Sequence, residues 1–246
     1  MLYPTDEKIK QKKGRISVMI IYGKQVCLYA LKEHKQSIKT VYLAKKGLLS
    51  QPLFDTYKPK IKFLEEKWAQ SMSRGGNHQG ILLDIDEFEE TPLSQIKKGD
   101  FIVVLDGLTD VGNIGAIVRS AYAMGADAVV ATGVKKLRYS AIIRSSSGAL
   151  LDMPMLINHN IADVLNELHQ VGFISYGASM GGKSIEQMNF APKRVLVLGS
   201  EGEGLSKRAK SKIKESVSIE MKHSFDSLNV SAAGAILIHR MGYAVR

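Results

Sequence analysis

Several residue types are scarce in this chain of 246 residues, and each scarcity excludes a class of protein. The single cysteine, Cys27, lies among apolar neighbours, so the chain has neither an internal disulfide nor a Cys-x-x-Cys metal site, and we expect a reducing cytosol. No apolar run approaches the roughly 20 residues that a membrane span needs, and the amino terminus is charged. We therefore expect a cytoplasmic protein that neither spans a membrane nor is exported.

The charge balance is strongly basic. There are 34 Lys and Arg against 24 Asp and Glu, which gives a formal net charge of +10. A broadly basic body suits a polyanion better than a small anion, although a general solubility effect would give the same composition. Basic residues crowd positions 1–15, where we expect a flexible arm. The six histidines show no metal-ligand spacing, so zinc sites and nucleophilic triads are not supported.

Hydrophobic periodicity divides the chain into two α/β units, with a boundary near residue 95. Residues 16–90 form the smaller unit, and the polar, acidic stretch at 91–100 predicts a linker. In the smaller unit we expect strands at 16–21, 38–44 and 81–85, a helix at 23–33, and a mixed segment at 57–69 that becomes helical. Residues 101–246 alternate strands with helices, which predicts a mainly parallel sheet covered on both faces. Strands are expected there at 101–105, 128–132, near 155, 172–178, 195–198 and 217–219, and helices at 114–124, 140–147, 161–170 and 229–243.

A buried strand, a polar turn and a helix meet in residues 104–125. The apolar residues of this helix recur at helical spacing and form one stripe, and Arg119 falls outside it. Asn113 is a good helix N-cap and Gly125 a good helix stop, and Arg119 alone can be an ordinary surface arginine. Because α/β proteins bind ligands at the carboxyl ends of buried strands, Asn113 and Arg119 are also candidate functional residues.

Two later segments are organised in the same way. Residues 195–206 run from a buried strand into three glycines around Glu201, and glycines let the backbone approach a ligand closely. A plain turn would explain the glycines, but packing gives the Glu201 carboxylate no purpose. Residues 217–238 join a strand to a helix through a polar loop, in which Ser227 or Asn229 can cap the helix. Small residues at 231–235 allow close packing, either within the fold or across a dimer.

Residues 177–184, Gly-Ala-Ser-Met-Gly-Gly-Lys-Ser, match the phosphate-binding P-loop pattern, and residues 101–106 resemble a magnesium-binding strand. Together they suggest an NTPase. The helix that a P-loop must open would cover only residues 185–190 before Pro192, too few to direct a useful dipole at phosphate. The aspartate strand also precedes the loop, which is not the usual order, so we disfavour an NTPase.

Three segments, taken in order, resemble the motifs of the SpoU (TrmH-like) RNA 2'-O-ribose methyltransferases of the SPOUT superfamily. They are residues 113–119 (Asn-Ile-Gly-Ala-Ile-Val-Arg), 198–205 (Leu-Gly-Ser-Glu-Gly-Glu-Gly-Leu) and 227–231 (Ser-Leu-Asn-Val-Ser). Upstream, residues 21–23 and 77–81 are similar to the ribosomal-protein-like RNA-binding domain that many members carry. The resemblance implies a small α/β RNA-binding domain at 16–90 and a parallel-sheet SPOUT domain at 101–246, whose chain end is threaded into a trefoil knot.

The resemblance also implies a cofactor, an assembly and a set of site residues. S-adenosylmethionine would be held by the backbone around Gly199, Ile219, Met221 and Leu228, a homodimer would complete each site, and no metal is needed. The catalytic or substrate-positioning residues would be Asn113, Arg119, Glu201, Ser227 and Asn229. A guanidinium holds its proton very tightly and is therefore a poor base. We therefore expect Arg119 first to clamp an RNA phosphate and only second to act as a phosphate-assisted base, with Glu201 orienting Arg119 or the ribose.

One departure concerns the third motif, which usually opens Ile-Pro-Met-x-Gly and here reads Ile-Glu-Met-Lys-His at 219–223. Glu220 and His223 are expected to alter the shape of this loop or its contact with RNA. We expect 2'-O-methylation of structured RNA, with large-subunit ribosomal RNA favoured over tRNA. The alternative is a catalytically silent RNA-binding or ribosome-assembly homologue. His78 and His223 lie in polar loops and are candidate RNA contacts, and His239 is expected in the core or at an interface.

Overall fold

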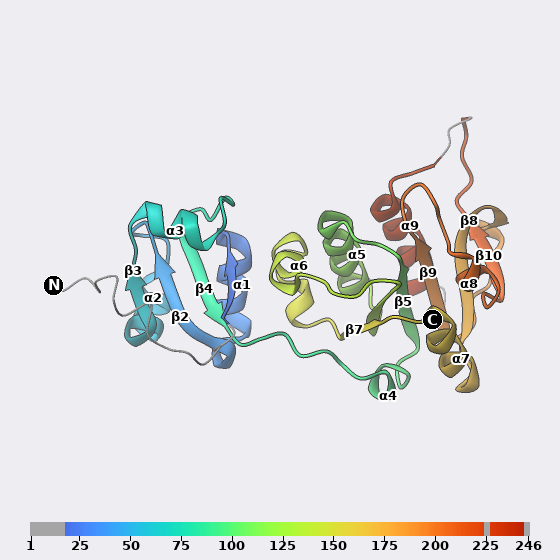
Figure 1. The fold of residues 1–246 in the computed structure, drawn as a ribbon, viewed down its shortest axis with the longest axis horizontal. Helices are drawn as coiled ribbons and strands as arrows, with labels where there is room; N and C mark the ends of the chain where they lie inside the picture. The colour runs from blue at the N-terminus through green and yellow to red at the C-terminus, as the bar shows by residue number, and fades with distance from the viewer. Residues whose placement is uncertain (1–17, 224–226, 244–246) are drawn as a thin grey trace.

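The computed structural model of the protein describes residues 18–223 and 227–243 and contains two sheets, each with its own helices (Figure 1). The arm expected at residues 1–15 lies outside the described residues. The N-terminal sheet has the order β1-β4-β2-β3, with β2 parallel to β3 and the other pairs antiparallel. Its strands are β1 (Met19–Tyr22), β2 (Ile38–Leu43), β3 (Ile61–Phe63) and β4 (Ile81–Ile85), and its helices are α1 (Lys24–Glu33), α2 (Gln51–Tyr57) and α3 (Glu66–Met72).

The C-terminal sheet has six strands in the order β10-β8-β9-β5-β6-β7, and every neighbouring pair is parallel, as predicted. The strands are β5 (Phe101–Asp106), β6 (Ala128–Thr132), β7 (Met155–Asn158), β8 (Ile174–Ser184), β9 (Arg194–Gly199) and β10 (Glu215–Ser218). The helices are α4 (Leu93–Ile96), α5 (Val111–Ala123), α6 (Tyr139–Ser145), α7 (Ile161–Gln170), α8 (Lys207–Lys210) and α9 (Val230–Gly242). Short 3-10 helices are η2 (Lys35–Ser37), η3 (Lys58–Lys60), η4 (Ala149–Leu151) and η5 (Ile185–Gln187).

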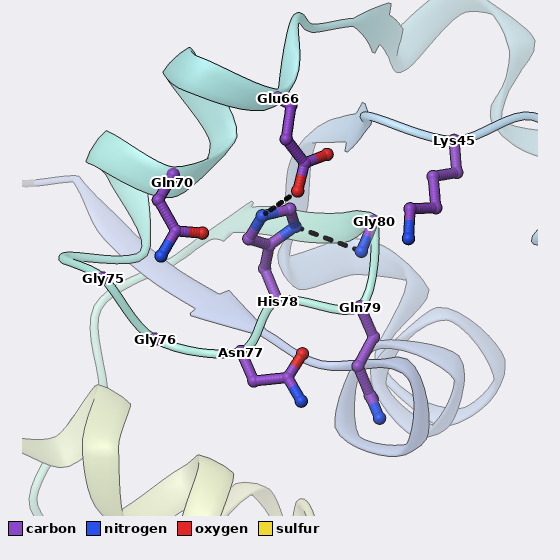
Figure 2. A pocket seen from close by; sticks show the side chains of 9 residues that line it. All are labelled: Lys45, Glu66, Gln70, Gly75, Gly76, Asn77, His78, Gln79 and Gly80. Carbon is purple, nitrogen blue, oxygen red and sulfur yellow. Dashed lines mark hydrogen bonds and ion pairs between the residues drawn. The ribbon is translucent and has the colours of Figure 1, made fainter.

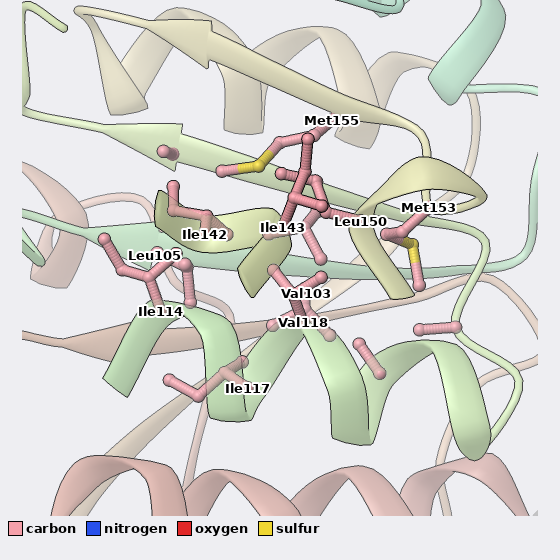
Figure 3. Packing of buried hydrophobic residues seen from close by; sticks show 14 of the residues in the cluster. Val103, Leu105, Ile114, Ile117, Val118, Ile142, Ile143, Leu150, Met153 and Met155 are labelled. Carbon is pink, nitrogen blue, oxygen red and sulfur yellow. The ribbon is translucent and has the colours of Figure 1, made fainter. Parts of the chain in front are cut away.

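Helices cover both faces of the C-terminal sheet. Along β5, Val103 and Leu105 pack on the side of α5, α6 and α9, whereas Ile102 and Val104 pack on the side of α4, α7 and α8. Figure 3 shows the first of these cores, where Ile114 of α5 lies among the side chains of β5 and α6. Successive residues of a strand face opposite sides, so burial on both sides explains the continuous apolar run that marks β5 in the sequence.

The P-loop-like segment is extended chain and not a phosphate-binding loop. Strand β8 continues to Ser184, and its pairing with β10 moves from Gly177 directly to Lys183. A Cβ on Gly182 would lie 2.8 Å from the backbone of β10, so this glycine permits close strand contact. Only the three-residue η5 follows the strand. The segment therefore lacks the helix that a P-loop opens, which agrees with the rejection of an NTPase.

The stretch expected to be a linker contacts the C-terminal domain. It contains α4, whose Ile96 is buried, and the Thr91 amide donates to the Met155 carbonyl at 2.9 Å. The Glu90 carboxylate accepts from the Tyr139 hydroxyl at 2.6 Å and from the Ile157 amide at 3.0 Å. Helix α4 is too short to show a hydrophobic period in the sequence, and the same holds for the short helices α2 and α8.

Cys27 lies on α1 and is completely buried in the N-terminal core. Burial raises the pKa of its thiol, because the thiolate would lose its hydration. The residue therefore behaves as a small apolar side chain. Among the helices of residues 18–223 and 227–243, none has the length and apolar character that crossing a membrane requires.

Arg194 ties the start of β9 to the end of α9. It is 6 % exposed, and its Nε donates to the Met241 carbonyl at 2.9 Å while Nη1 donates to the Pro192 carbonyl at 2.6 Å. The guanidinium lies 4.7 Å from the centre of the Phe101 ring. Burial lowers the pKa of Arg194, and these carbonyl and ring contacts offset the cost of placing a charge there.

We expect Arg194→Met to lower the midpoint of thermal unfolding by about 5 °C or more, because the buried Met241 carbonyl and the Pro192 carbonyl lose a charged donor, at a cost of about 2 kcal/mol. Differential scanning calorimetry measures the change. The matched control is Arg208→Met, since Arg208 is exposed on α8 and should shift the midpoint by less than about 2 °C. Equal midpoints for the two variants would contradict the role given to Arg194.

Candidate active site

The predicted site residues surround the carboxyl ends of β5 and β9, which are neighbours in the sheet with Asp106 in register with Gly199. After β5 the sheet grows through β6 and β7 on one side, and β8, β9 and β10 lie on the other side. The strand order therefore reverses between β5 and β9. Loops leave such a point in opposite directions and open a crevice, which is where open α/β sheets bind ligands.

Asn113 lies in the first turn of α5 and is not its N-cap. The cap is Asp110, whose Oδ1 accepts from the Asn113 amide at 2.7 Å. The prediction that Asn113 caps this helix is wrong because Asp110, three residues earlier, already satisfies the free amide. This leaves the Asn113 side chain available, and its Nδ2 donates to Oε1 of Glu201 at 3.1 Å.

The loop after β9 is a tight, internally bonded turn. Ser200 and Gly204 exchange two backbone hydrogen bonds of 3.1 and 3.0 Å. A Cβ on Gly199 would lie 2.2 Å from the backbone of Gly204, so only glycine lets the loop close here. The buried carboxylate of Asp106 fixes the far side of the loop, because its Oδ2 accepts from the Ser206 amide at 2.8 Å.

Glu201 lies in this loop and joins all three motif segments. Its Oε1 accepts from Nδ2 of Asn113 at 3.1 Å and from Nδ2 of Asn229 at 2.6 Å. Asn229 in turn caps α9, since its Oδ1 accepts from the Ser231 amide at 2.9 Å. Oε2 of Glu201 accepts no hydrogen bond from any residue that the structure describes. The two amides therefore hold the carboxylate in place through Oε1, and its second oxygen, Oε2, stays free.

Arg119 lies apart from this cluster. Its Nη1 donates to the Ser147 hydroxyl at 3.2 Å, in the turn that follows α6. The structure thus gives Glu201 two asparagine partners instead of Arg119, which differs from the expectation that Glu201 orients this arginine. Arg119 lies six positions after Asn113, which places the two residues on different faces of α5. Arg119 is exposed, so its guanidinium can reach a ligand outside the protein.

The residues predicted to hold S-adenosylmethionine come from the loops after β9 and β10. Ile219 and Leu228 are half-buried and Met221 is 37 % exposed, so apolar side chains face this region. The hydrogen bond from Asn229 to Glu201 brings the two loops together. Within the described chain, the amides of residues 201–203 have no backbone or side-chain acceptor. Apolar surface beside free backbone donors fits an adenine and a polar amino-acid tail.

The remaining predicted residues have simpler surroundings. Ser227 is exposed, two positions before the cap of α9, and makes no side-chain hydrogen bond with the described residues. Glu220, Lys222 and His223 are also exposed, so the replaced proline and glycine of the third motif lie at the surface. His239 is exposed as well, 5.0 Å from the ring of Tyr243, which excludes the core position.

His78 is a structural residue and not a free RNA contact. Figure 2 shows it in a pocket of the N-terminal domain, where its Nε2 lies 3.2 Å from Oε1 of Glu66 and its Nδ1 accepts from the Gly80 amide at 3.0 Å. The side chain is 3 % exposed. The prediction that His78 contacts RNA is therefore wrong, because the ring is used to hold the loop of residues 76–80. The loop's neighbouring amides, on Asn77 and Gln79, remain at the surface.

Sequence reasoning missed Asp110, which caps α5, and Ser147, which accepts from Arg119. The signal for Asp110 was present, because Asp followed three residues later by a helical position is an N-cap pattern. Ser147 has a positive φ of 57°, which no sequence pattern revealed. Among the described residues, no group of three His, Cys, Asp or Glu side chains is placed to hold a metal.

Comparison with known proteins agrees with this geometry in both halves of the chain. The SpoU rRNA Methylase family model matches residues 100–239, and the model for RNA 2'-O ribose methyltransferase substrate binding matches residues 20–91. A methylase domain together with a substrate-binding domain defines a two-domain RNA methyltransferase. The chain belongs to the SpoU rRNA methylase family, and it is an S-adenosylmethionine-dependent RNA 2'-O-ribose methyltransferase.

Curated relatives and solved structures give the same family. The chain is 31 % identical to the 23S rRNA (guanosine-2'-O-)-methyltransferase RlmB of Yersinia pestis, over 89 % of this chain and 94 % of the relative. It is 30 % identical to RlmB of Neisseria meningitidis serogroup B, over 73 % and 74 %. The SpoU methyltransferase AviRb from Streptomyces viridochromogenes, in complex with AdoMet, is similar with a TM-score of 0.74, at 22 % identity over 92 % of this chain and 89 % of that one. The predicted family, fold class and cofactor are confirmed, whereas the roles of individual residues stay predictions.

We expect Glu201→Ala to lower the rate of methyl transfer by about 100-fold, because the amides of Asn113 and Asn229 lose their acceptor and the site loses its fixed carboxylate. The initial rate with radiolabelled S-adenosylmethionine measures the change. Glu203→Ala is the matched control, since Glu203 lies in the same loop, is exposed and has no described partner. A similar loss in both variants would assign the effect to loop charge and would contradict a specific role for Glu201.

Proposed function

We propose that this enzyme methylates the ribose 2'-hydroxyl of a guanosine in large-subunit (23S) ribosomal RNA. The relatives that span most of the chain are named for this reaction, which supports the substrate. The observation that carries the chemistry is the Glu201 cluster, which joins the three motif segments at the switch point of the sheet. We assign RNA binding to residues 16–90, the connection to residues 91–100 and the SPOUT domain to residues 101–246.

The protein contributes to this reaction mainly by positioning the ribose hydroxyl against the methyl group. S-adenosylmethionine, when bound, supplies an electrophilic methyl group and needs no metal. The chain must hold the ribose hydroxyl in line with that methyl group and assist the loss of its proton. Glu201, fixed by Asn113 and Asn229, is the group we assign to orienting the ribose, because its Oε2 is free to accept from a hydroxyl. Ser227, exposed beside Asn229, is assigned to the same substrate-facing edge.

Arg119 is assigned to the RNA phosphate next to the target ribose. Its guanidinium is exposed and has a single hydroxyl partner, Ser147, which a phosphate can replace. An arginine remains protonated at neutral pH and binds phosphate through two parallel N–H donors. Fixing the phosphate also fixes the ribose attached to it. A phosphate-assisted uptake of the hydroxyl proton by Arg119 is the second assignment.

The cofactor is assigned to the loops around Gly199, Ile219, Met221 and Leu228. The free amides of residues 201–203 and the half-buried apolar side chains of the second loop support this placement. We also propose that the chain end is threaded into a trefoil knot. Membership of the SpoU rRNA methylase family supports it, and the end of α9 packs against the end of α5, where a Cβ on Gly242 would lie 2.5 Å from the Met124 carbonyl.

We propose that the enzyme works as a cytoplasmic homodimer. Helix α9 carries an exposed stripe at helical spacing, formed by Ile236, His239 and Tyr243, with Ile236 43 % and Tyr243 49 % exposed. Helix α9 also begins next to the Glu201 cluster. An exposed stripe on this helix supports a contact between subunits. A cytoplasmic location agrees with the free, buried Cys27 and with a ribosomal substrate.

For the substrate, we expect the wild-type enzyme to transfer a methyl group to 23S ribosomal RNA and Arg119→Ala to lose at least about 100-fold in transfer rate, because the clamp on the phosphate is removed. S-adenosylmethionine affinity, measured by calorimetry, should change less than about threefold. Arg208→Met is the control and should retain full activity. Transfer to tRNA instead of ribosomal RNA would contradict the substrate, and a wild-type enzyme that binds no cofactor would support a silent homologue.

For the assembly, we expect Ile236→Glu to convert the dimer to a monomer in sedimentation-velocity experiments, because a carboxylate replaces an apolar contact in the interface. Val18→Glu places the same charge on an exposed valine of the N-terminal domain and should leave the dimer intact. A wild-type protein that sediments as a monomer at micromolar concentration would contradict the homodimer.

A further inference from the structure

A pocket lies where the two domains meet, beside the partner of Arg119. It has a volume of about 250 Å³ and takes its walls from β1, from the loop of residues 76–80 and from the end of α6. We call it the interdomain pocket. The residues that matter for the argument are Tyr22, Gln25, Asn77, Gln79, Arg144 and Ser147. Figure 1 shows α6 on the side of the C-terminal domain that faces the N-terminal domain.

The two domains are held together beside this pocket by specific contacts. The Tyr29 hydroxyl of α1 donates to Oδ2 of Asp152, and the His34 ring lies 3.3 Å from the same carboxylate. A Cβ on Gly148 would lie 2.6 Å from the Tyr29 ring, so this glycine permits the close approach. Because the contacts combine shape with hydrogen bonds, the walls of the pocket have a defined relative position.

The walls suit a nucleobase. The Arg144 guanidinium lies 5.1 Å from the centre of the Tyr22 ring, so the two groups form a cation–π pair between the domains, and both residues line the pocket. Unstacked RNA bases are bound by stacking on such aromatic and guanidinium planes. The described lining contains no carboxylate and includes one arginine, which favours a polyanion over a cation.

The edge of the pocket carries amide groups that match the polar edge of a base. Gln79 is fixed, because its Oε1 accepts from the Lys24 amide at 2.7 Å, and this leaves its NH2 group as a donor. The side chains of Gln25 and Asn77 form no hydrogen bond with the described residues, and both are exposed. Amides offer both donors and acceptors, which is what discrimination between bases requires.

Ser147 links the pocket to the transfer site. It lines the pocket, and its hydroxyl accepts from Nη1 of Arg119 at 3.2 Å. Its positive φ of 57° is a rare conformation for serine, of a kind that clusters at functional sites. A ligand in the pocket is therefore one side chain away from the guanidinium that we assign to the phosphate beside the target ribose.

We propose that the interdomain pocket binds the base of a nucleotide that flanks the methylated one, with the Tyr22–Arg144 pair as its stacking surface and Asn77 and Gln79 as the groups that read its edge. The proposal rests on the proposed function. It makes sequence selection a joint property of the two domains, because the base contacts both while its phosphate contacts Arg119. A flanking base that does not fit would then displace the phosphate and the ribose from the transfer site.

The test uses the full-length enzyme and a fragment of 23S ribosomal RNA whose flanking nucleotides are replaced one at a time. For the wild type, we expect one flanking position whose replacement lowers kcat/KM about tenfold or more. In Arg144→Met and in Asn77→Ala, KM for the original fragment should rise about tenfold, and replacement at that position should have less than a threefold effect. Arg208→Met controls for the loss of one positive charge and should keep the wild-type discrimination. Unchanged cofactor affinity and unchanged thermal unfolding midpoints show that the variants are folded.

A second measurement locates the base directly. With the thio-substituted analogue of the native base at the discriminating position, ultraviolet crosslinking should label peptides containing Tyr22 or Asn77. Labelling of exposed aromatic residues elsewhere in the N-terminal domain, such as Phe63 or Trp68, would overturn the proposal. So would variants that discriminate as the wild type does. If the wild type transfers no methyl group to any ribosomal RNA fragment, the proposed function itself fails, whereas transfer with unaltered discrimination in the variants contradicts only the pocket.

Discussion

The carboxylate of Glu201 is the constraint on which the candidate active site depends. Its Oε1 accepts hydrogen bonds from Asn113 after β5 and from Asn229 at the start of α9, so three distant segments share one oxygen. Hydrogen bonds to a charged acceptor are shorter and stronger than neutral ones. The remaining structure makes this meeting possible: Asp110 caps α5 and frees the Asn113 side chain, Gly199 and Gly204 close the loop, and Asp106 holds its far side.

The family membership and the geometry divide the work between two places. The Glu201 cluster and the loops after β9 and β10 form one region, which we assign to the cofactor and the ribose. Arg119 and Ser147 form another, on the side of α5 that faces the N-terminal domain. An RNA strand that spans both would contact the small domain before its ribose reaches the transfer site. The proposed assignments therefore couple substrate choice to catalysis through α5 and the turn after α6.

Much of the fold could be predicted because burial on both faces leaves a continuous apolar run, as in β5 and β9, and an amphipathic helix leaves a stripe, as in α7. The bounds of β6 and α7 agree with prediction. Short elements such as α2, α4 and α8 were missed because one or two turns show no period. The candidate residues could be named from three motifs, but their pairing could not. Glu201 contacts Asn113 across 88 residues of sequence, and Arg119 contacts Ser147 across 28. These contacts depend on helix phase and loop closure, which the sequence pattern does not show.

The most direct test of the central claim is a nucleotide-resolution map of ribose methylation in 23S ribosomal RNA from cells that lack this gene. The account predicts that one 2'-O-methylguanosine disappears, returns with the wild-type gene and with Glu203→Ala, and stays absent with Glu201→Ala or Arg119→Ala produced at equal levels. A map that is the same with and without the gene, or a site that Glu201→Ala restores in full, would contradict it.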